Sequence, residues 1–469
     1  MIARSLAELA AQAGARLDRV PDAGAQVTGP VVIDSRQAGP GSLFVALPGE
    51  HADGHDFAAA AVAAGAAAVL AARPVGVPAL VVPDVLAALA ALARATVGAA
   101  PRLTIAAITG SAGKTTTKDL AAQLIEPLGP TVAPAASLNN EIGVPLTVLR
   151  VTAGTRYLIC EMSARGPGHI TALCRIAPPD LGAVLCVGNA HAGEFGGIEN
   201  VARAKGELPA ALPPSGVAVL NADDPRVAAM AKRTAARVVT FGRSDGADVR
   251  AAGVRTDGRG RAAFTLQAGG ASAPVALRLH GEHHVTNALA AAALAIELGL
   301  PAAAAAAGLS AAVARSRWRM EVTERGDGVT IVNDAYNANP ESMAAALRAL
   351  AAMSAGRRSF AVLGEMTELG AASEQFHREA GAQAAAAGVS GLLVVGAGAA
   401  PVAAGAKAAP GPAGDGWHGE LIEVPDGPAA VAALAGRLRA GDVVLVKASH
   451  SIGLERVALA LAGQDGAGR

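Results

Sequence analysis

The stretch "ITGSAGKTTTKDL" (residues 108–120) decides the fold of the region of the sequence in which it lies. An apolar run at residues 103–109 comes before the glycines, and a helical pattern begins at Lys114. A strand that ends in a glycine-bearing turn and continues as a helix is the geometry of a phosphate site, because backbone N–H groups of the turn and the helix start converge on the anion. A glycine turn capped by a threonine-rich helix start would explain the same residues without a ligand.

The lysine and the threonine at the helix start are the residue types that a nucleotide site needs. Lys114 would reach the terminal phosphates, and the Thr115 hydroxyl would complete a magnesium shell. The usual P-loop signature has a glycine where this chain has Ile108, so the loop is the shortened form G-x-x-G-K-T. The loop alone leaves GTPases, kinases and transport ATPases open.

Composition excludes several classes of partner. Lysine plus arginine and aspartate plus glutamate both number 39, so no global charge points to nucleic acid or to a membrane surface. The three cysteines form no C-x-x-C pair, which is typical of a reducing compartment. No apolar stretch near the N-terminus resembles a signal peptide or is long enough for a bilayer span. We therefore expect a cytoplasmic protein.

At 469 residues the chain is too long for one ordinary core. Apolar runs alternate with helices in the middle and last regions, which favours parallel sheets covered on both faces. A hairpin-like stretch lies near 248–280, and residues 396–420 lack periodicity and are predicted to form an exposed loop. We predict an α/β chain with a small N-terminal α/β domain (1–84), a central P-loop, parallel-sheet, ATPase-like domain (85–314) and a C-terminal Rossmann-like domain (315–469).

Three polar residues downstream of the loop narrow the choice of chemistry. Glu161 lies at the end of an apolar run, where a carboxylate could hold magnesium. His191 follows another such run, and Lys205 falls on a predicted helix. Taken singly, a histidine near a loop is commonly a surface residue and a helical lysine is commonly a solvated charge. The three gain meaning only together with the phosphate loop.

Nine segments, taken together, resemble the Mur ligases of peptidoglycan synthesis. In chain order they are "TGSAGKTT", "SLNNEIGVPLTVL", "EMSARGPGHI", "NAHAGEFGG", "AKGEL", "LNADDP", "SRWRMEV", "NDAYNANPESM" and "VLGEMTELG". The resemblance runs through all three regions and is much more specific than the loop. In that family the loop begins T-G-x-x-G-K-T, so Ile108 is no defect.

The resemblance implies an ATP site, two magnesium sites and a role for each matching residue. The phosphate loop would be Thr109, Gly110, Ser111, Ala112, Gly113, Lys114 and Thr115. Catalytic positions would be Lys114, Glu161, His191 and Lys205; the last three would hold metal together with Thr115, and Lys205 matches a lysine that related ligases carbamylate. The rest of the nucleotide would face Asn287, Arg319 and Asp334. Substrate contacts would come from Asp34, Ser35 and Arg36 at the uridine end, from Asn139, Asn140 and Glu141 at the muramoyl part, and from Tyr336, Asn337 and Asn339 near the incoming dipeptide.

The chain departs from the family pattern at one visible place. Where the family often has G-x-H-N-x-x-N, this chain has "GEHHVTN" (281–287), with His284 in place of the first asparagine. An amide contact at that position is therefore in doubt. Asn287 is retained.

The implied chemistry is ATP-driven formation of an amide bond. The resemblance is strongest to the members that join D-alanyl-D-alanine to UDP-N-acetylmuramoyl-tripeptide through an acyl phosphate, and we expect a monomer. A sister ligase that adds one amino acid shares the ATP residues, although the D-N-P-R segment of the diaminopimelate-adding group is replaced here by "DAYNANPE" (334–341). A folylpolyglutamate synthase-like ligase shares the central fold. A nucleotide-binding regulator without turnover is the alternative from another class.

Overall fold

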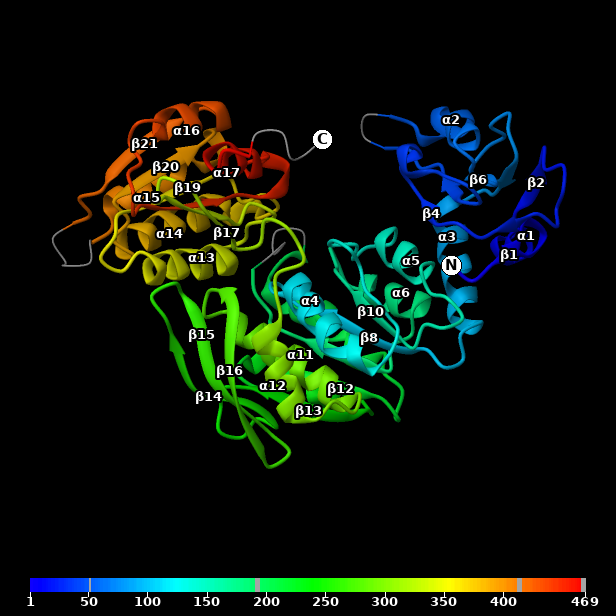
Figure 1. Cartoon of the computed structure of the whole chain (residues 1–469), viewed down its shortest axis with the longest axis horizontal. Helices are drawn as coiled ribbons and strands as arrows, with labels where there is room; N and C mark the ends of the chain where they lie inside the picture. The colour runs from blue at the N-terminus through cyan, green and yellow to red at the C-terminus, as the bar shows by residue number, and fades with distance from the viewer. Residues whose placement is uncertain (50–51, 190–194, 411–415, 465–469) are drawn as a thin grey trace.

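The computed structural model describes residues 1–49, 52–189, 195–410 and 416–464. Figure 1 shows three bodies along the chain, coloured blue, cyan to green, and yellow to red, each with helices packed on a sheet. The predicted three-domain α/β architecture is confirmed. The boundaries at 84 and 314 remain predictions.

The N-terminal body is built on a five-stranded sheet of short strands. In spatial order these are β2 (Arg16–Asp18), β7 (Ala79–Val81), β6 (Ala68–Ala71), β5 (Leu43–Val45) and β4 (Val31–Val32). Strand β2 is antiparallel to β7, and the remaining pairs are parallel. Two further strands form a separate pair, and two helices pack nearby: β1 (Arg4–Ser5), β3 (Gln26–Val27), α1 (Leu6–Ala13) and α2 (Ala58–Ala63). A capping box of Ser5 and Glu8 starts α1.

Helix α3 (Val85–Gly98) joins the N-terminal body to the central one. It packs against α1 on one side and α5 (Gly143–Val148) on the other, with Leu89 and Leu92 fully buried. Arg4 Nη1 also donates a hydrogen bond to Thr96 Oγ1 at 3.0 Å. One continuous apolar core therefore runs from the first body into the second.

The central body contains a nine-stranded sheet. Its order is β16 (Ala271–His280), β15 (Arg261–Ala268), β14 (Val249–Thr256), β13 (Arg237–Gly242), β12 (Val217–Asn221), β11 (Leu181–Val184), β8 (Thr104–Thr109), β10 (Tyr157–Glu161) and β9 (Thr131–Val132). The ladder from β9 to β14 is parallel, and β15 and β16 are antiparallel additions. Strands β8, β10 and β11 are buried and mainly apolar because helices cover both of their faces, and β10 ends in the buried Glu161.

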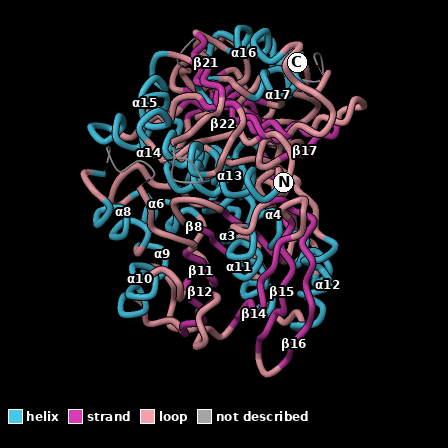
Figure 2. Tube along the Cα trace, turned by 90° about the vertical axis from the view of Figure 1, so that its left-hand side faces the viewer, coloured by secondary structure: helices cyan, strands magenta, loops and turns pink. Residues whose placement is uncertain are grey.

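The helices of the central body divide between the two faces of this sheet. One face carries α4 (Lys114–Ile125), α11 (His284–Glu297) and α12 (Ala302–Ala311). The other carries α5, α6 (His169–Ile176), α8 (Ile198–Lys205) and α9 (Glu207–Ala210), and the short α10 (Pro225–Ala228) follows β12. The predicted hairpin near 248–280 is confirmed, with Asp257 N donating to Arg261 O at its turn. Figure 2 shows β14, β15 and β16 as a long ribbon that projects away from the C-terminal body.

The C-terminal body is a doubly wound six-stranded sheet, as predicted. Its order is β17 (Glu321–Glu324), β18 (Thr330–Asn333), β22 (Val443–Lys447), β19 (Ser359–Leu363), β20 (Gly391–Val395) and β21 (Glu420–Val424). Only the β17–β18 pair is antiparallel among these described strands. One face is covered by α13 (Pro340–Met353), α14 (Ser373–Ala386) and α15 (Ala400–Ala408), and the other by α16 (Gly427–Leu434) and α17 (Glu455–Leu461).

The predicted exposed loop at 396–420 is wrong over much of its length. Residues 400–408 form α15, in which Val402 and Ala406 are buried, and residues 411–415 lie outside the described chain. Helix α15 lies so close to α14 that a Cβ at Gly381 or Gly405 would overlap backbone of the opposite helix. Alanine and glycine provide this packing without an apolar–polar period, so the sequence pattern carried no signal for it.

Candidate active site

The phosphate loop has the geometry that its sequence predicts. Strand β8 ends at Thr109, and α4 begins at Lys114 directly after Gly113, whose φ is +82°. A side chain at Gly113 would be strained and would overlap Asn287 Oδ1, so glycine is required there. Lys114 Nζ donates to Gly110 O at 2.7 Å, which places the ammonium across the loop. Burial lowers the pKa of Lys114.

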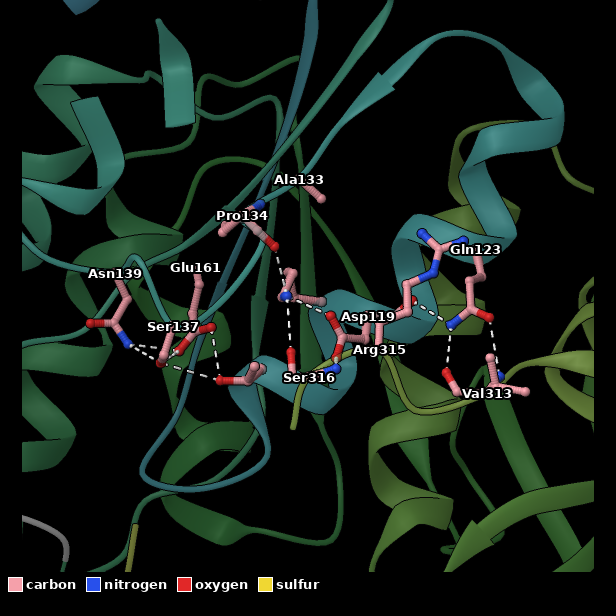
Figure 3. Close-up of polar contacts among 12 residues, drawn as sticks. Asp119, Gln123, Ala133, Pro134, Ser137, Asn139, Glu161, Val313, Arg315 and Ser316 are labelled. Atoms are coloured by element: carbon pink, nitrogen blue, oxygen red, sulfur yellow. Dashed lines mark hydrogen bonds and ion pairs between the residues drawn. The ribbon is translucent and has the colours of Figure 1, made fainter. Parts of the chain in front are cut away.

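A polar cluster surrounds Glu161 at the end of β10, the strand beside β8. Thr115 Oγ1 donates to Glu161 Oε2 at 2.9 Å, while Ser137 Oγ and Asn139 Nδ2 donate to Oε1 at 3.0 and 2.7 Å. Figure 3 shows Ser137 and Asn139 converging on the carboxylate from the segment after β9. Glu161 is fully buried, so these donors compensate its charge. Hydroxyl and carboxylate oxygens together are the donor types that Mg²⁺ prefers.

Lys205 lies at the end of α8 and is 3% exposed. Burial, reinforced by the positive charge of Lys114, lowers the pKa of Lys205 to about 7. Lys205 does not line the cavity described below, and His191 lies outside the described residues. Within the described ranges no group of three His, Cys, Asp or Glu side chains could hold a metal ion. The magnesium ligands therefore remain predictions.

The C-terminal body contributes stacked rings and a buried ion pair. Arg319 Cζ lies 4.2 Å from the centre of the Tyr336 ring, and that ring stacks on His450 at 5.3 Å. Lys447, only 2% exposed, donates to Asp334 Oδ2 at 2.6 Å and to Asn337 O at 2.8 Å. These bonds fix the Asp334–Asn337 turn at the end of β18.

The start of α11 carries the residues at which the chain departs from its resemblance. His284 is 3% exposed, and its Nδ1 lies 3.2 Å from Asn287 Nδ2. Because an amide nitrogen only donates, this contact leaves the ring hydrogen on Nε2. Burial, with His283 beside it, holds the pKa of His284 well below its ordinary value. His284 is therefore a neutral imidazole whose Nε2 has no partner among the described residues.

The central and C-terminal bodies meet beside the phosphate loop. Asn339 Nδ2 donates to Ser111 O at 3.4 Å, and Asn189 N donates to Glu341 Oε1 at 2.6 Å. Asn339 also caps α13, because its Oδ1 accepts from Ser342 N. The first turn of α13 therefore rests directly on the loop.

A cavity of about 890 Å³ lies between these two bodies. It brings together most of the predicted site residues: Ser111, Ala112, Gly113, Lys114, Thr115, Asn139, Asn140, Glu141, Glu161, Asn287, Arg319, Asp334, Tyr336, Asn337 and Asn339. Thr109 and Gly110, the first two residues of the loop, are buried and do not line the cavity. Ser35 and Arg36 lie apart, on the N-terminal body, where Asp34 caps the turn of 35–37 and pairs with an exposed Arg36.

Several lining residues were missed by sequence reasoning. They are Ser137, His283, Arg348, Lys447, Ser449 and His450. Lys447 ends β22, and Ser449 and His450 follow it. Ligands of open α/β sheets bind at the carboxyl ends of parallel strands. The segment "DVVLVKASH" (442–450) therefore contained a usable signal. Arg348 carried none, because an arginine on an amphipathic helix is ordinarily a solvated charge.

The fold and the site define a three-domain α/β protein with a phosphate loop facing a second doubly wound domain. Three family descriptions match the sequence: the Mur ligase middle domain over residues 108–295, the Mur ligase glutamate ligase domain over 318–450, and the Mur ligase family catalytic domain over 30–96. The chain belongs to the Mur ligase family.

Its relatives include proteins named UDP-N-acetylmuramoyl-tripeptide–D-alanyl-D-alanine ligase. The one from Mycobacterium tuberculosis (strain ATCC 25618 / H37Rv) is 52% identical over 99% of this chain and 98% of its own length. The one from Escherichia coli (strain K12) is 37% identical over 78% of this chain and 81% of its own.

Solved structures of Mur ligases superpose on most of this chain. MurF from Acinetobacter baumannii superposes with a TM-score of 0.86 at 29% identity, covering 98% of this chain and 99% of that one. MurF ligase from Thermotoga maritima in complex with ADP gives 0.78 at 30% identity, covering 93% and 98%. None of the described helices combines the length and apolar character of a membrane span.

Proposed function

We propose that this protein is an ATP-dependent ligase that joins D-alanyl-D-alanine to UDP-N-acetylmuramoyl-tripeptide. The observation that carries the proposal is that one cavity is lined both by the phosphate loop and by the Asp334–Asn337 turn of the C-terminal body. A reaction that joins a phosphorylated acid to an amine needs both reactants at one place. The named relatives that align over nearly the whole chain support the same activity.

The first step transfers the γ-phosphoryl group of ATP to the tripeptide carboxylate, which gives an acyl phosphate and ADP. A carboxylate approaching a triphosphate is repelled, and the Lys114 ammonium beside the loop offsets that repulsion where charge accumulates. Backbone N–H groups at the start of α4 hold the phosphates in place. Positioning and charge supply most of the rate in such a step.

In the second step the amine of the dipeptide attacks the acyl carbon, and phosphate leaves. Tyr336 and Asn337 lie across the cavity from the loop, where they can orient the acceptor. Asn337 is exposed, whereas the Asn339 amide is used in the cap of α13, so Asn337 is the better placed of the two. The contacts of the first body at Ser35 and Arg36 serve the distant uridine end of the other substrate.

Magnesium fits the residues present. The Thr115 hydroxyl and the Glu161 carboxylate are hard oxygen donors 2.9 Å apart at the mouth of the loop. Bound Mg²⁺ supplies neutralisation of phosphate charge. Asn139 and Ser137 orient the Glu161 carboxylate toward that position. We propose that Lys205 becomes a carbamate, because its lowered pKa makes the neutral amine available to CO₂ and a carboxylate-like group relieves the repulsion between Lys205 and Lys114.

The location follows from the substrates. ATP and a UDP-linked precursor are cytoplasmic metabolites, and all three cysteines are free. We therefore place the protein in the cytoplasm.

The test is ADP release by the purified protein. Multiple-turnover release of ADP should require UDP-N-acetylmuramoyl-tripeptide and D-alanyl-D-alanine together with ATP and magnesium, because without the dipeptide the acyl phosphate has no amine to react with. Omission of either substrate is the matched control. A protein that binds ATP and releases no ADP with both substrates would instead be a nucleotide-binding regulator.

A further inference from the structure

Helix α4 follows the phosphate loop, and its middle turns also contact residues 313–316. These residues are the linker that enters the C-terminal body. Lys118 is 1% exposed and Asp119 is 5% exposed, although both are charged. Neither lines the main cavity. A buried charge persists only where partners compensate it, so the contacts of this pair show what the pair is for.

The Lys118 ammonium has three N–H donors, and three acceptors on other residues surround it. It pairs with Asp119, donates to Pro134 O at 2.8 Å and reaches Ser316 Oγ at 3.4 Å. Asp119 Oδ2 accepts from Ser316 N at 2.9 Å. Figure 3 labels Asp119, Pro134 and Ser316 of this cluster beside the Glu161 cluster. The pair therefore fastens two segments to α4: the one that leads to Ser137 and the linker at Ser316.

A second contact, one turn further along α4, holds the same linker. Gln123 Nε2 donates to Val313 O at 2.9 Å, and Gln123 Oε1 accepts from Val313 N at 3.1 Å. This two-way pairing imitates that of a neighbouring backbone. Arg315, which is labelled in Figure 3, also forms an ion pair with Glu126. Residues 313–316 thus have a fixed course along the helix.

The linker reaches the cavity three residues after Ser316. Arg319 lines that cavity, and the residues on either side of it, Trp318 and Met320, have φ values of +60° and +53°. Such left-handed backbone at non-glycine residues is strained and persists only when its surroundings hold it. On the downstream side Met320 N donates to Asp334 Oδ1 at 2.9 Å. On the upstream side Trp318 N donates to Glu321 Oε2 at 2.9 Å, and Trp318 O accepts from Tyr336 N at 3.2 Å. Two residues earlier, Ser316 is held on α4.

We propose that Lys118 and Asp119 are positioning residues of the ligase, which fix Ser316 against the phosphate-loop helix and thereby hold Arg319 over the cavity. The inference rests on the proposed function for its kinetic consequences, but its effect on nucleotide binding does not depend on the acceptor. Helix α4 therefore connects the phosphate loop to the C-terminal body, because it begins at Lys114 and also contacts the linker.

The test compares Lys118→Met and Asp119→Asn with Lys232→Met, which removes an exposed lysine of the same body. ADP affinity is measured by calorimetry, and the KM for ATP and kcat are measured by ADP release. We expect K118M and D119N to weaken ADP binding and raise the KM for ATP on the order of tenfold or more, because a displaced contact group loses its alignment. K232M should match the wild type.

A double-mutant cycle with Arg319→Ala separates positioning from general destabilisation. If Lys118 acts through Arg319, K118M should weaken ADP binding less than about twofold further once Arg319 is gone. Effects of K118M and R319A that multiply would overturn the proposal, as would an R319A variant that binds ADP like the wild type. A K118M variant with lower thermal stability and unchanged ADP affinity would overturn it too.

Gln123→Ala keeps the proposal testable if K118M fails to fold. Gln123 is only half-buried and bonds the linker through Val313 alone. Its loss should weaken ADP binding in the same direction and again add little to R319A. A wild-type protein that binds ADP and forms no product would count against the proposed function and leave this test intact.

Discussion

Thr115 Oγ1 lies 2.9 Å from Glu161 Oε2, which joins the first turn of the phosphate-loop helix to the end of the neighbouring strand. Strands β8 and β10 are parallel partners in the sheet, with Ile108 opposite Glu161. Residues that follow both strands are therefore brought to the same edge. This contact places the two oxygen donors proposed for magnesium at the phosphate loop.

Lys114→Ala should abolish ligation and leave the fold intact. The ammonium offsets charge at the transferred phosphoryl group, and the loss of one such donor costs on the order of a hundredfold or more in kcat. The measurement is ADP release at saturating ATP and magnesium, with Lys232→Ala as the control. Turnover of K114A at the wild-type rate would remove the phosphate-loop assignment.

Glu161→Gln should raise the magnesium concentration needed for half-maximal activity. The amide keeps the shape of the side chain but removes the charge that attracts the cation, and such changes weaken metal affinity on the order of tenfold or more. A magnesium titration of ADP release measures the shift. The exposed Glu199→Gln is the matched control, and the same half-maximal concentration in E161Q and wild type would contradict the assignment.

Lys205→Ala should lose activity and regain part of it with a small added carboxylate such as acetate. The lowered pKa, about 7, makes the neutral amine abundant above that pH. Carbamate formation, and with it activity, should therefore rise as pH increases through 7 at fixed dissolved CO₂. Activity measured after removal and return of CO₂ checks this, and an activity that ignores CO₂ would exclude the carbamate.

Lys205 also makes stability depend on pH. The pKa of Lys205 is about 7 in the folded chain and has its ordinary value of 10.5 in the unfolded chain. Between these two pH values the unfolded chain therefore holds more protons at this lysine than the folded chain does. The contribution of Lys205 to the free energy of unfolding should therefore rise with pH across that window and be flat below it. Lys205→Met should remove this slope in denaturation curves recorded without CO₂.

His284→Asn should preserve ADP binding. Both side chains are neutral and both can bond to Asn287, so the exchange should weaken ADP affinity by no more than about tenfold, the range of one hydrogen bond. Calorimetry with ADP measures the change, with His280→Asn, outside the cavity, as the control. A loss of ADP binding in H284N would show that the imidazole has a role an amide cannot take.

Sequence reasoning recovered the parts of the site that follow parallel strands. Glu161 and the phosphate loop could be placed because each directly follows an apolar run, and the structure brings them together. The buried Lys118–Asp119 pair was missed because its meaning depends on Ser316, almost two hundred residues away. Helix α15 was missed because alanine and glycine pack closely without an apolar period.

The acceptor tests the central claim most directly. A single amino acid and D-alanyl-D-alanine present the same attacking amine, so the discrimination must come from contacts beyond it, to the second residue and its carboxylate. Leaving such buried polar groups unpaired costs about 1–3 kcal/mol each. The measurement is product mass when UDP-N-acetylmuramoyl-tripeptide, ATP and magnesium are offered D-alanyl-D-alanine, D-alanine, L-lysine and diaminopimelate separately at equal concentration. The account predicts rapid formation of the pentapeptide product with the dipeptide and poor reaction with the others. A faster reaction with any single amino acid would contradict it and assign the protein to a sister ligase.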